Sequence, residues 1–412
     1  MEKEKMKSLY RGGMTLLIGF ISIKIGGLLF RFICMRYLPV DVYGEVAVFL
    51  VIFNWLLLFS TLNMTIGMAK FIAGDQKKRG AYFTSCLLGS LVIALLFGSL
   101  FVLFSPWISS ALKVQMPAMY WVAIGVPFSV IHSFGNFYFR SLFRMKSSAF
   151  LDLFMVAIRV ALLALLLVYS FSQAPYMAFV ASFIVADLYV IYRIRIDTRM
   201  KFSEMKSVFR NVLFYSFPIF LGEFLSSFSM GIDRILIAGF YSTTEAGFYD
   251  VGVALCLGYM LIASSYANAL LPLASSSDRS PEKRKKQLFR ALKASTLLFA
   301  IYTAVLLVLA KSVIEFVNPV YLGVLDFLPQ LMASYISIGY LVIMFFYVNS
   351  TGRQRLAFYA AALFAFLNTA LNLYLTPTML YAGAAGALVS SSALSLVFIG
   401  VLVWKSERKP YA

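Results

Sequence analysis

Long apolar blocks, separated by short polar connections, run the whole length of the chain. Each block is close to or longer than the roughly 20 residues that cross a bilayer as a helix. The blocks lack the short alternating pattern of a membrane β-barrel, and a helix satisfies its own backbone hydrogen bonds in lipid. We therefore predict an all-α integral membrane protein with about twelve transmembrane helices, near residues 12–37, 43–72, 81–105, 117–142, 148–171, 175–195, 211–240, 246–273, 288–311, 325–349, 356–376 and 381–404.

Composition agrees with this layout and excludes an ordinary soluble protein. Hydrophobic residues make up 61% of the 412 residues and charged residues only 13%, against about 25% charged in soluble domains. The three cysteines, Cys34, Cys86 and Cys256, lie inside apolar blocks and have no disulfide or metal spacing.

The positions of the basic residues predict the topology. Of the 36 Lys and Arg residues, 28 lie in the two tails and the even-numbered connections, and only Lys113 and Lys311 lie in the odd-numbered ones. Lys and Arg are concentrated on the cytoplasmic side of membrane proteins. We therefore expect both termini to be cytoplasmic, and we interpret the net charge of +18 as a topology signal and not as a nucleic-acid surface.

A polar connection divides the chain into two halves of six helices. The prediction is an N-terminal lobe at 1–196, a cytoplasmic connector at 197–210 and a C-terminal lobe at 211–412. Arg31 precedes Gly44 by thirteen residues, and Arg234 precedes Gly247 by the same distance. Six is an even number, so the two lobes would share one orientation and be related by a pseudo-two-fold axis along the membrane normal.

Four segments resemble one family of membrane transporters. They are Arg36-Tyr37-Leu38-Pro39 with Asp41-Val42-Tyr43-Gly44; Gly67 to Ala73; Ser216-Phe217-Pro218 with Asp233-Arg234, Ala246 to Tyr249 and Leu270-Leu271-Pro272; and Asn368, Asn372 and Pro377 with Gly383 to Ala387. In these the chain resembles the polysaccharide-flippase branch of the multidrug/oligosaccharidyl-lipid/polysaccharide (MOP) exporter superfamily. That branch includes the Wzx-type O-antigen flippases, with the lipid II flippase MurJ and the MATE drug exporters more distant. Pro39 departs from the usual Gly, and Lys70 from a frequent Arg.

The resemblance implies a function, partners and a location. It implies a flippase that moves undecaprenyl-diphosphate-linked oligosaccharide repeats across the bacterial inner membrane, for O-antigen or another surface polysaccharide. A polysaccharide polymerase and chain-length machinery would be its protein partners. It leaves the sugar and the energy source open. We expect no cofactor and no metal, because the sequence has no nucleotide-binding loop and no metal-ligand spacing.

Charges inside the apolar blocks are the candidate site, because each costs roughly 2.5–3.5 kcal/mol at mid-bilayer. Lys24 and Arg31 are seven residues apart, so they share one face of the first helix. No carboxylate lies between Arg11 and Val40 to neutralise them locally. We predict that they line a cavity for the diphosphate, which suits the planar fork of Arg and the point charge of Lys.

Other intramembrane charges allow two interpretations. Arg234, Lys70 and Arg159 are candidates for the same cationic cavity. Arg159 could instead pair with Asp152, seven residues earlier on the same face, and Lys70 could anchor the cytoplasmic end of its helix. Asp233 and Arg234 are neighbours that point about 100° apart, so we expect them not to face each other.

A second group of polar residues could couple transport to an ion or line the cavity. His132 and Asn136 are one turn apart, with Arg140 one turn further, and form a polar stripe on one helix. Asp233 and Glu223 are the acidic candidates, with Asp187 as a further one. Asn368 and Asn372 are also one turn apart and indicate hydrogen bonds between helices.

No arrangement of catalytic residues stands out, so we predict that the chain is not an enzyme. The single histidine has no cysteine partner in a polar loop, and no nucleotide-binding Gly-rich loop is present. A MATE-like cation or drug antiporter is the alternative, although it would favour acids in the first helix. A membrane polymerase or ligase is a weaker alternative, because the outer connections 106–116 and 312–324 are short.

Overall fold

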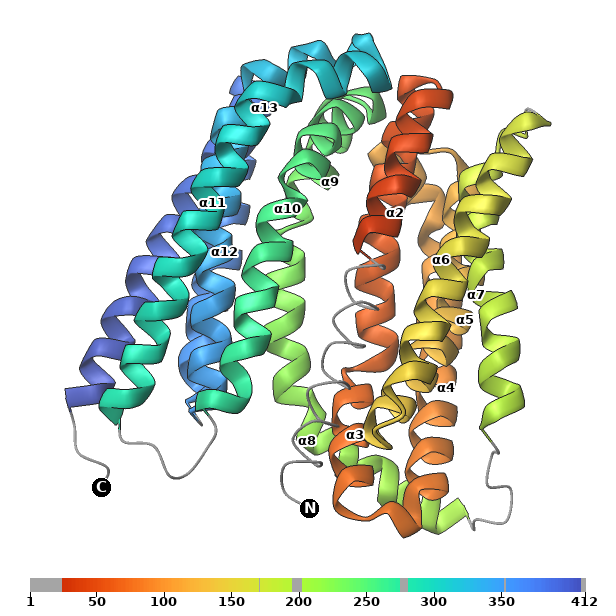
Figure 1. The fold of residues 1–412 in the computed structure, drawn as a ribbon. Coiled ribbons are helices and arrows are strands. Elements are labelled where there is room, and N and C mark those ends of the chain that lie inside the picture. Colours follow the sequence, from red (N-terminus) through yellow and green to blue (C-terminus); the bar gives the residue numbers. More distant parts are fainter. Residues whose placement is uncertain (1–23, 170, 195–201, 275–280, 352, 409–412) are drawn as a thin grey trace. The chain divides into compact units, whose positions relative to one another are not determined.

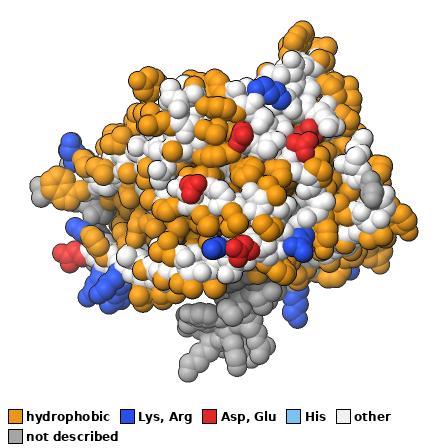
Figure 2. Space-filling view, turned by 90° about the horizontal axis from the view of Figure 1, so that it is seen from above, with side chains coloured by type: hydrophobic (Ala, Val, Ile, Leu, Met, Phe, Trp, Pro, Cys, Tyr) orange, Lys and Arg blue, Asp and Glu red, His pale blue; other side chains and the backbone are white. Residues whose placement is uncertain are grey.

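The computed structural model describes residues 24–169, 171–194, 202–274, 281–351 and 353–408. Regular structure in these ranges is helical, with no strand among them. The described residues include ten helices that are long and apolar enough to cross a membrane. Figure 2 looks from above onto the ends of the helices, where apolar side chains are abundant and charged ones few.

The chain divides into two compact units, Met1–Leu221 and Gly222–Ala412. The boundary between these units falls inside α8 (Phe202–Ser229). Residues early in α8 explain this, because Phe209 lies against Gly89, and Val212 and Ser216 lie against Gly67. The predicted lobe limits stay a prediction.

Unit 1 is a bundle organised around α5, which packs on five other helices. Its helices run side by side in Figure 1. They are a first helix described over residues 24–37, then α2 (Val40–Thr61), α3 (Met64–Gly74), α4 (Arg79–Leu112), α5 (Met116–Ser141), α6 (Met145–Val168) and α7 (Ala174–Arg193), with a short 3-10 turn, η1 (Gln76–Lys78).

Unit 2 is organised around α10 and α12, which pack on each other. It contains α9 (Ile232–Phe240), α10 (Thr243–Ala274), α11 (Pro281–Val317), η2 (Pro319–Asp326), α12 (Leu328–Ser350) and α13 (Gln354–Arg408). The long α13 holds two predicted helices, since Leu380 interrupts it with φ 49° and ψ −118°. Gly383 is required beside this kink, because a Cβ there would collide with the Leu375 carbonyl.

Two predicted single helices are broken, which corrects the sequence prediction. The segment 43–72 becomes α2 and α3, because Leu62 and Asn63 adopt φ of 45° and 54°. Asparagine tolerates this left-handed conformation, which stops an α-helix. The segment 211–240 becomes α8 and α9, separated at Met230 and Gly231. Counting α13 as two spans, the described residues contain eleven of the twelve predicted helices. The first helix, predicted at 12–37, is described over 24–37, and residues 12–23 lie outside the described residues.

Candidate functional site

The first helix presents Lys24 and Arg31 away from its main packing face. Gly26 lies so close to Val156 of α6 that a Cβ would collide with it, and the Phe30 ring lies 5.8 Å from that of Phe179 on α7. At about 100° per residue, Lys24 is on the opposite side of the helix from Gly26. Lys24 is exposed and Arg31 is half-buried. Gly26 therefore serves close helix packing, and the two cations point away from Gly26 and Phe30. One turn beyond Arg31 the same face is packed, because Met35 is buried.

Arg159 is buried between aromatic rings behind the first helix. Its guanidinium carbon lies 3.9 Å from the Phe179 ring centre and 5.0 Å from that of Phe183. Its Nε donates a hydrogen bond to Ser182 Oγ at 3.1 Å, while its Nη2 has no hydrogen-bond partner among the described residues. Phe179 thus contacts both Phe30 of the first helix and the Arg159 guanidinium.

The predicted ion pair between Asp152 and Arg159 is wrong. Asp152 instead accepts a 2.5 Å hydrogen bond from the Asn136 amide, and its other oxygen lies 3.5 Å from the Arg140 guanidinium. Seven residues give the same helix face but a separation of about 10 Å along the axis, which is too far for a direct pair. The carboxylate reaches across to α5 and not along α6.

His132 lies between two buried carboxylates in unit 1. Its Nε2 is 3.4 Å from Asp152 Oδ1, and its Nδ1 is 3.7 Å from Asp187 Oδ1 on α7. The cluster extends through Asn136 to Ser148, which donates a 2.8 Å hydrogen bond to the amide oxygen. Neither oxygen of Asp187 has a hydrogen-bond partner among the described residues. The polar stripe predicted on α5 therefore meets acids from α6 and α7.

Arg234 is held between carboxylates in unit 2. Its Nη1 is 2.9 Å from Asp250 Oδ1 on α10, and its Nη2 donates to the Met230 carbonyl. Its Nε is 3.7 Å from Asp233 Oδ1, so the expectation that these neighbours do not face each other is wrong. The long Arg side chain folds back over the shorter Asp. Asp250 was missed, although its place one residue after Tyr249 in a resembling segment could have suggested it.

The other predicted residues lie apart from these clusters. Lys70 is exposed on α3, with its Nζ 3.7 Å from the Tyr215 ring centre on α8, and Glu223 is exposed on α8. Asn368 and Asn372 are buried, and Asn368 donates a 2.7 Å hydrogen bond to the Ser229 carbonyl. Asn372 bonds to Asn368, so this pair joins α13 to the end of α8 as predicted.

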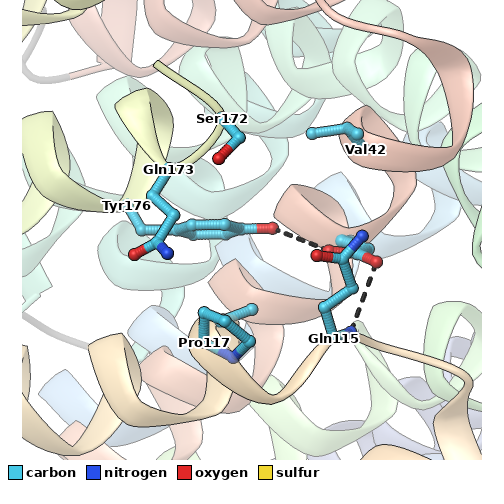
Figure 3. A pocket seen from close by; sticks show the side chains of 8 residues that line it. Val42, Gln115, Pro117, Ser172, Gln173 and Tyr176 are labelled. Atoms are coloured by element: carbon cyan, nitrogen blue, oxygen red, sulfur yellow. Dashed lines mark hydrogen bonds between the residues drawn. The ribbon is translucent and has the colours of Figure 1, made fainter.

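A small polar pocket in unit 1 also escaped the sequence analysis (Figure 3). Glu45 of α2 is buried there and accepts hydrogen bonds from the Gln115 backbone N–H at 3.3 Å and the Tyr176 hydroxyl at 3.2 Å. The pocket measures about 70 Å³. Ligand sites usually measure about 300–1,000 Å³, so this pocket has room for a few waters but not for a sugar. The sequence signal for this pocket was Glu45, a carboxylate that follows Gly44 inside an apolar block.

Comparisons with known proteins identify the family. The chain matches the family described as "Polysaccharide biosynthesis protein" over residues 33–318, and it belongs to that family. The comparison with curated proteins found no match.

Solved structures with the same fold are membrane transporters. A multidrug resistance MATE family transporter of the MOP superfamily, in an inward-facing conformation, is 13% identical with a TM-score of 0.77, covering 96% of this chain and 100% of its own. The lipid II flippase MurJ is 14% identical with a TM-score of 0.79, and the match covers 95% of this chain and 87% of MurJ. A MOP superfamily transporter from Pyrococcus furiosus, described as having a binding pocket of reversed polarity, is 13% identical with a TM-score of 0.64. The match covers 98% of this chain and 97% of that transporter. The chain is a multi-pass membrane protein with the MATE and MurJ transporter fold.

Proposed function

We propose that the protein is a flippase for polyprenyl-diphosphate-linked oligosaccharides, of the Wzx type, that serves O-antigen or another surface polysaccharide. The membership of a polysaccharide biosynthesis family and the fold shared with a lipid II flippase support this proposal. The observation that carries it is the pair Lys24 and Arg31, two cations on one face of the first helix and away from its packing on α6 and α7. A diphosphate is the ligand that this pair suits.

The residues have graded roles in this proposal. Lys24 and Arg31 would contact the diphosphate, and Arg159 would add positive potential from behind Phe179. Lys70 would be a secondary contact at the end of α3. Arg234 is less available, because two carboxylates already contact its guanidinium. His132, Asn136, Asp233 and Glu223 are the coupling or cavity candidates, of which His132 lies closest to buried acids.

Alternating access would move the head group while the lipid tail stays in the bilayer. The protein would act in the bacterial inner membrane with both termini in the cytoplasm, beside a polymerase and chain-length proteins. A potential of 100 mV, negative inside, is worth about 2.3 kcal/mol per charge. Outward movement of an anionic head group would run with this field.

A MATE-like cation antiporter is the second candidate. The buried acids Asp152 and Asp187 of unit 1 favour it, because with His132 between them they could take up a coupling proton. The first helix disfavours it, since no acid lies between Arg11 and Val40.

A deletion strain tests the proposed site. We expect the wild-type chain to restore surface polysaccharide and the Lys24→Ala/Arg31→Ala variant to fail, at equal membrane expression. Arg36→Ala is the matched control, because Arg36 is an exposed cation near the other end of the same helix, and it should restore polysaccharide. Full restoration by the double variant would refute the site.

Flipping in proteoliposomes tests the function and its field dependence. A fluorescent polyprenyl-diphosphate sugar should become accessible to a quencher faster when the potential is negative on the side it leaves. A rate that ignores the potential would refute electrophoretic transport. Export of cationic drugs with no movement of the lipid-linked sugar would favour the antiporter.

A further inference from the structure

The start of α11 carries a dense basic segment. Residues 281–293 contain six Lys or Arg residues and a single acid, Glu282. The helix is 37 residues long, about 55 Å at 1.5 Å per residue, against a hydrocarbon core of about 30 Å. The apolar stretch between Lys293 and Lys311 spans about 27 Å and fills that core. The twelve residues before Lys293 therefore extend into the headgroup layer and beyond it.

The basic side chains lie on one face of this extension. Lys286, Arg290 and Lys293 are exposed and are spaced four and three residues apart, so they share one face, which we call the basic stripe. Phe289 lies within the stripe and is 59% exposed. The opposite face is buried, with Leu288, Ala291 and Ser295 packed into unit 2. The extension is therefore an amphipathic helix with an apolar inner face.

The basic stripe is continuous with the apolar surface of the same helix. Leu297, Ile301 and Val308 follow on the same side of α11 and are 64%, 50% and 74% exposed. Aliphatic side chains this exposed within a membrane span are suited to contact with acyl chains. The basic stripe, Lys286, Arg290 and Lys293, then lies at the level of the headgroups of those same lipids. Phe289 lies at the membrane–water interface, where aromatic residues are enriched.

A topology signal alone does not require this arrangement. The third helix of the first half, α4, begins at Arg79 and becomes apolar within its first turn. Its nearby cations are partly neutralised, since Lys78 lies 4.0 Å from Asp75. The α11 extension adds about three turns of charged helix that α4 lacks.

We propose that the basic stripe of α11 is a binding site for anionic phospholipid headgroups on the side of the membrane where α11 begins. Lys and Arg provide the phosphate contacts, and Phe289 inserts among the upper acyl carbons. This site is separate from the proposed flippase site in unit 1 and does not depend on the transported substrate.

A fluorophore on the stripe tests the proposal. The native cysteines are buried, so a dye can be attached to Phe289→Cys in the full-length chain in nanodiscs. Energy transfer to trace headgroup-labelled phosphatidylglycerol is compared with transfer to labelled phosphatidylcholine at equal mole fraction. We expect a severalfold local enrichment of the anionic acceptor, which falls in 1 M salt, where the Debye length is about 3 Å.

Charge variants separate the stripe from the general positive charge. Lys286→Gln/Arg290→Gln/Lys293→Gln should reduce the enrichment to the phosphatidylcholine level. Lys77→Gln/Lys78→Gln/Arg79→Gln removes the same charge before and at the start of α4 and should leave the enrichment unchanged. Lys286→Arg/Lys293→Arg should retain it, which guards against a folding defect. Equal transfer to both acceptors, or equal loss in both triple variants, would overturn the proposal.

Discussion

Arg234 of α9 and Asp250 of α10 form an ion pair inside unit 2, with Nη1 and Oδ1 2.9 Å apart. Both side chains are buried, and the backbone N–H of Arg234 also donates to Asp233 at 2.9 Å. The second half of the chain therefore uses its intramembrane cation to join two helices. The corresponding cation of the first half, Arg31, is half-buried on the first helix.

We predict that Asp250→Ala destabilises the protein strongly, by about 3–5 kcal/mol, because it leaves a buried guanidinium short of its closest carboxylate. The double variant Arg234→Met/Asp250→Leu should recover part of that loss, since it removes both buried charges. Thermal unfolding in detergent measures both effects. If Asp250→Ala left the unfolding temperature unchanged, the pair would not stabilise unit 2.

Gly26 and Gly27 are adjacent but meet different surroundings. A Cβ at Gly26 would collide with Val156, whereas a Cβ at Gly27 would find no atom within 4 Å. Gly26→Ala should therefore destabilise unit 1 by about 1–3 kcal/mol. Gly27→Ala should be neutral or stabilising by up to about 1 kcal/mol, because alanine favours the helix. Val156→Ala should rescue Gly26→Ala, and a failure of that rescue would contradict the close packing.

The two acids beside His132 should differ in their structural importance. Asp152 makes polar contacts with His132, Asn136 and Arg140, whereas the ion contact of Asp187 among the described residues is with His132. We expect Asp152→Ala to cost about 3 kcal/mol or more and Asp187→Asn to cost less than about 1 kcal/mol, because an amide can replace a carboxylate that accepts no hydrogen bond. Unfolding temperatures compare the two, and a larger loss for Asp187→Asn would reverse this assignment.

Glu45 and Glu245 each accept a tyrosine hydroxyl near the start of the second helix of their unit. Tyr176 donates to Glu45, and Tyr381 donates to Glu245. Glu45 is buried and also accepts the N–H at the start of α5, whereas Glu245 is half-buried. Glu45→Ala should therefore cost about 1–3 kcal/mol and Glu245→Ala less. Thermal unfolding of the two variants measures the difference, and equal costs would mean that burial does not matter here.

The apolar pattern was sufficient to predict the class of fold and most of the helices. Lipid leaves the backbone no alternative to helix, so a block of apolar residues determines an element almost by itself. The kink at Leu380 falls in the gap predicted between the helices 356–376 and 381–404, which holds Pro377. The sequence did not predict the helix breaks at Asn63 and Gly231, because single residues of these types are tolerated inside helices.

The sequence by itself determined that the chain crosses the membrane many times and which charges lie within its helices. Only the tertiary structure decided the partner of each charge, because partners come from other helices and their rotation about the helix axis is set by packing. Asp152 and Arg159 share a helix face but bind different neighbours, and Arg234 meets an acid sixteen residues away. Periodicity gives the face of a charge, and the contact depends on which helix lies against that face.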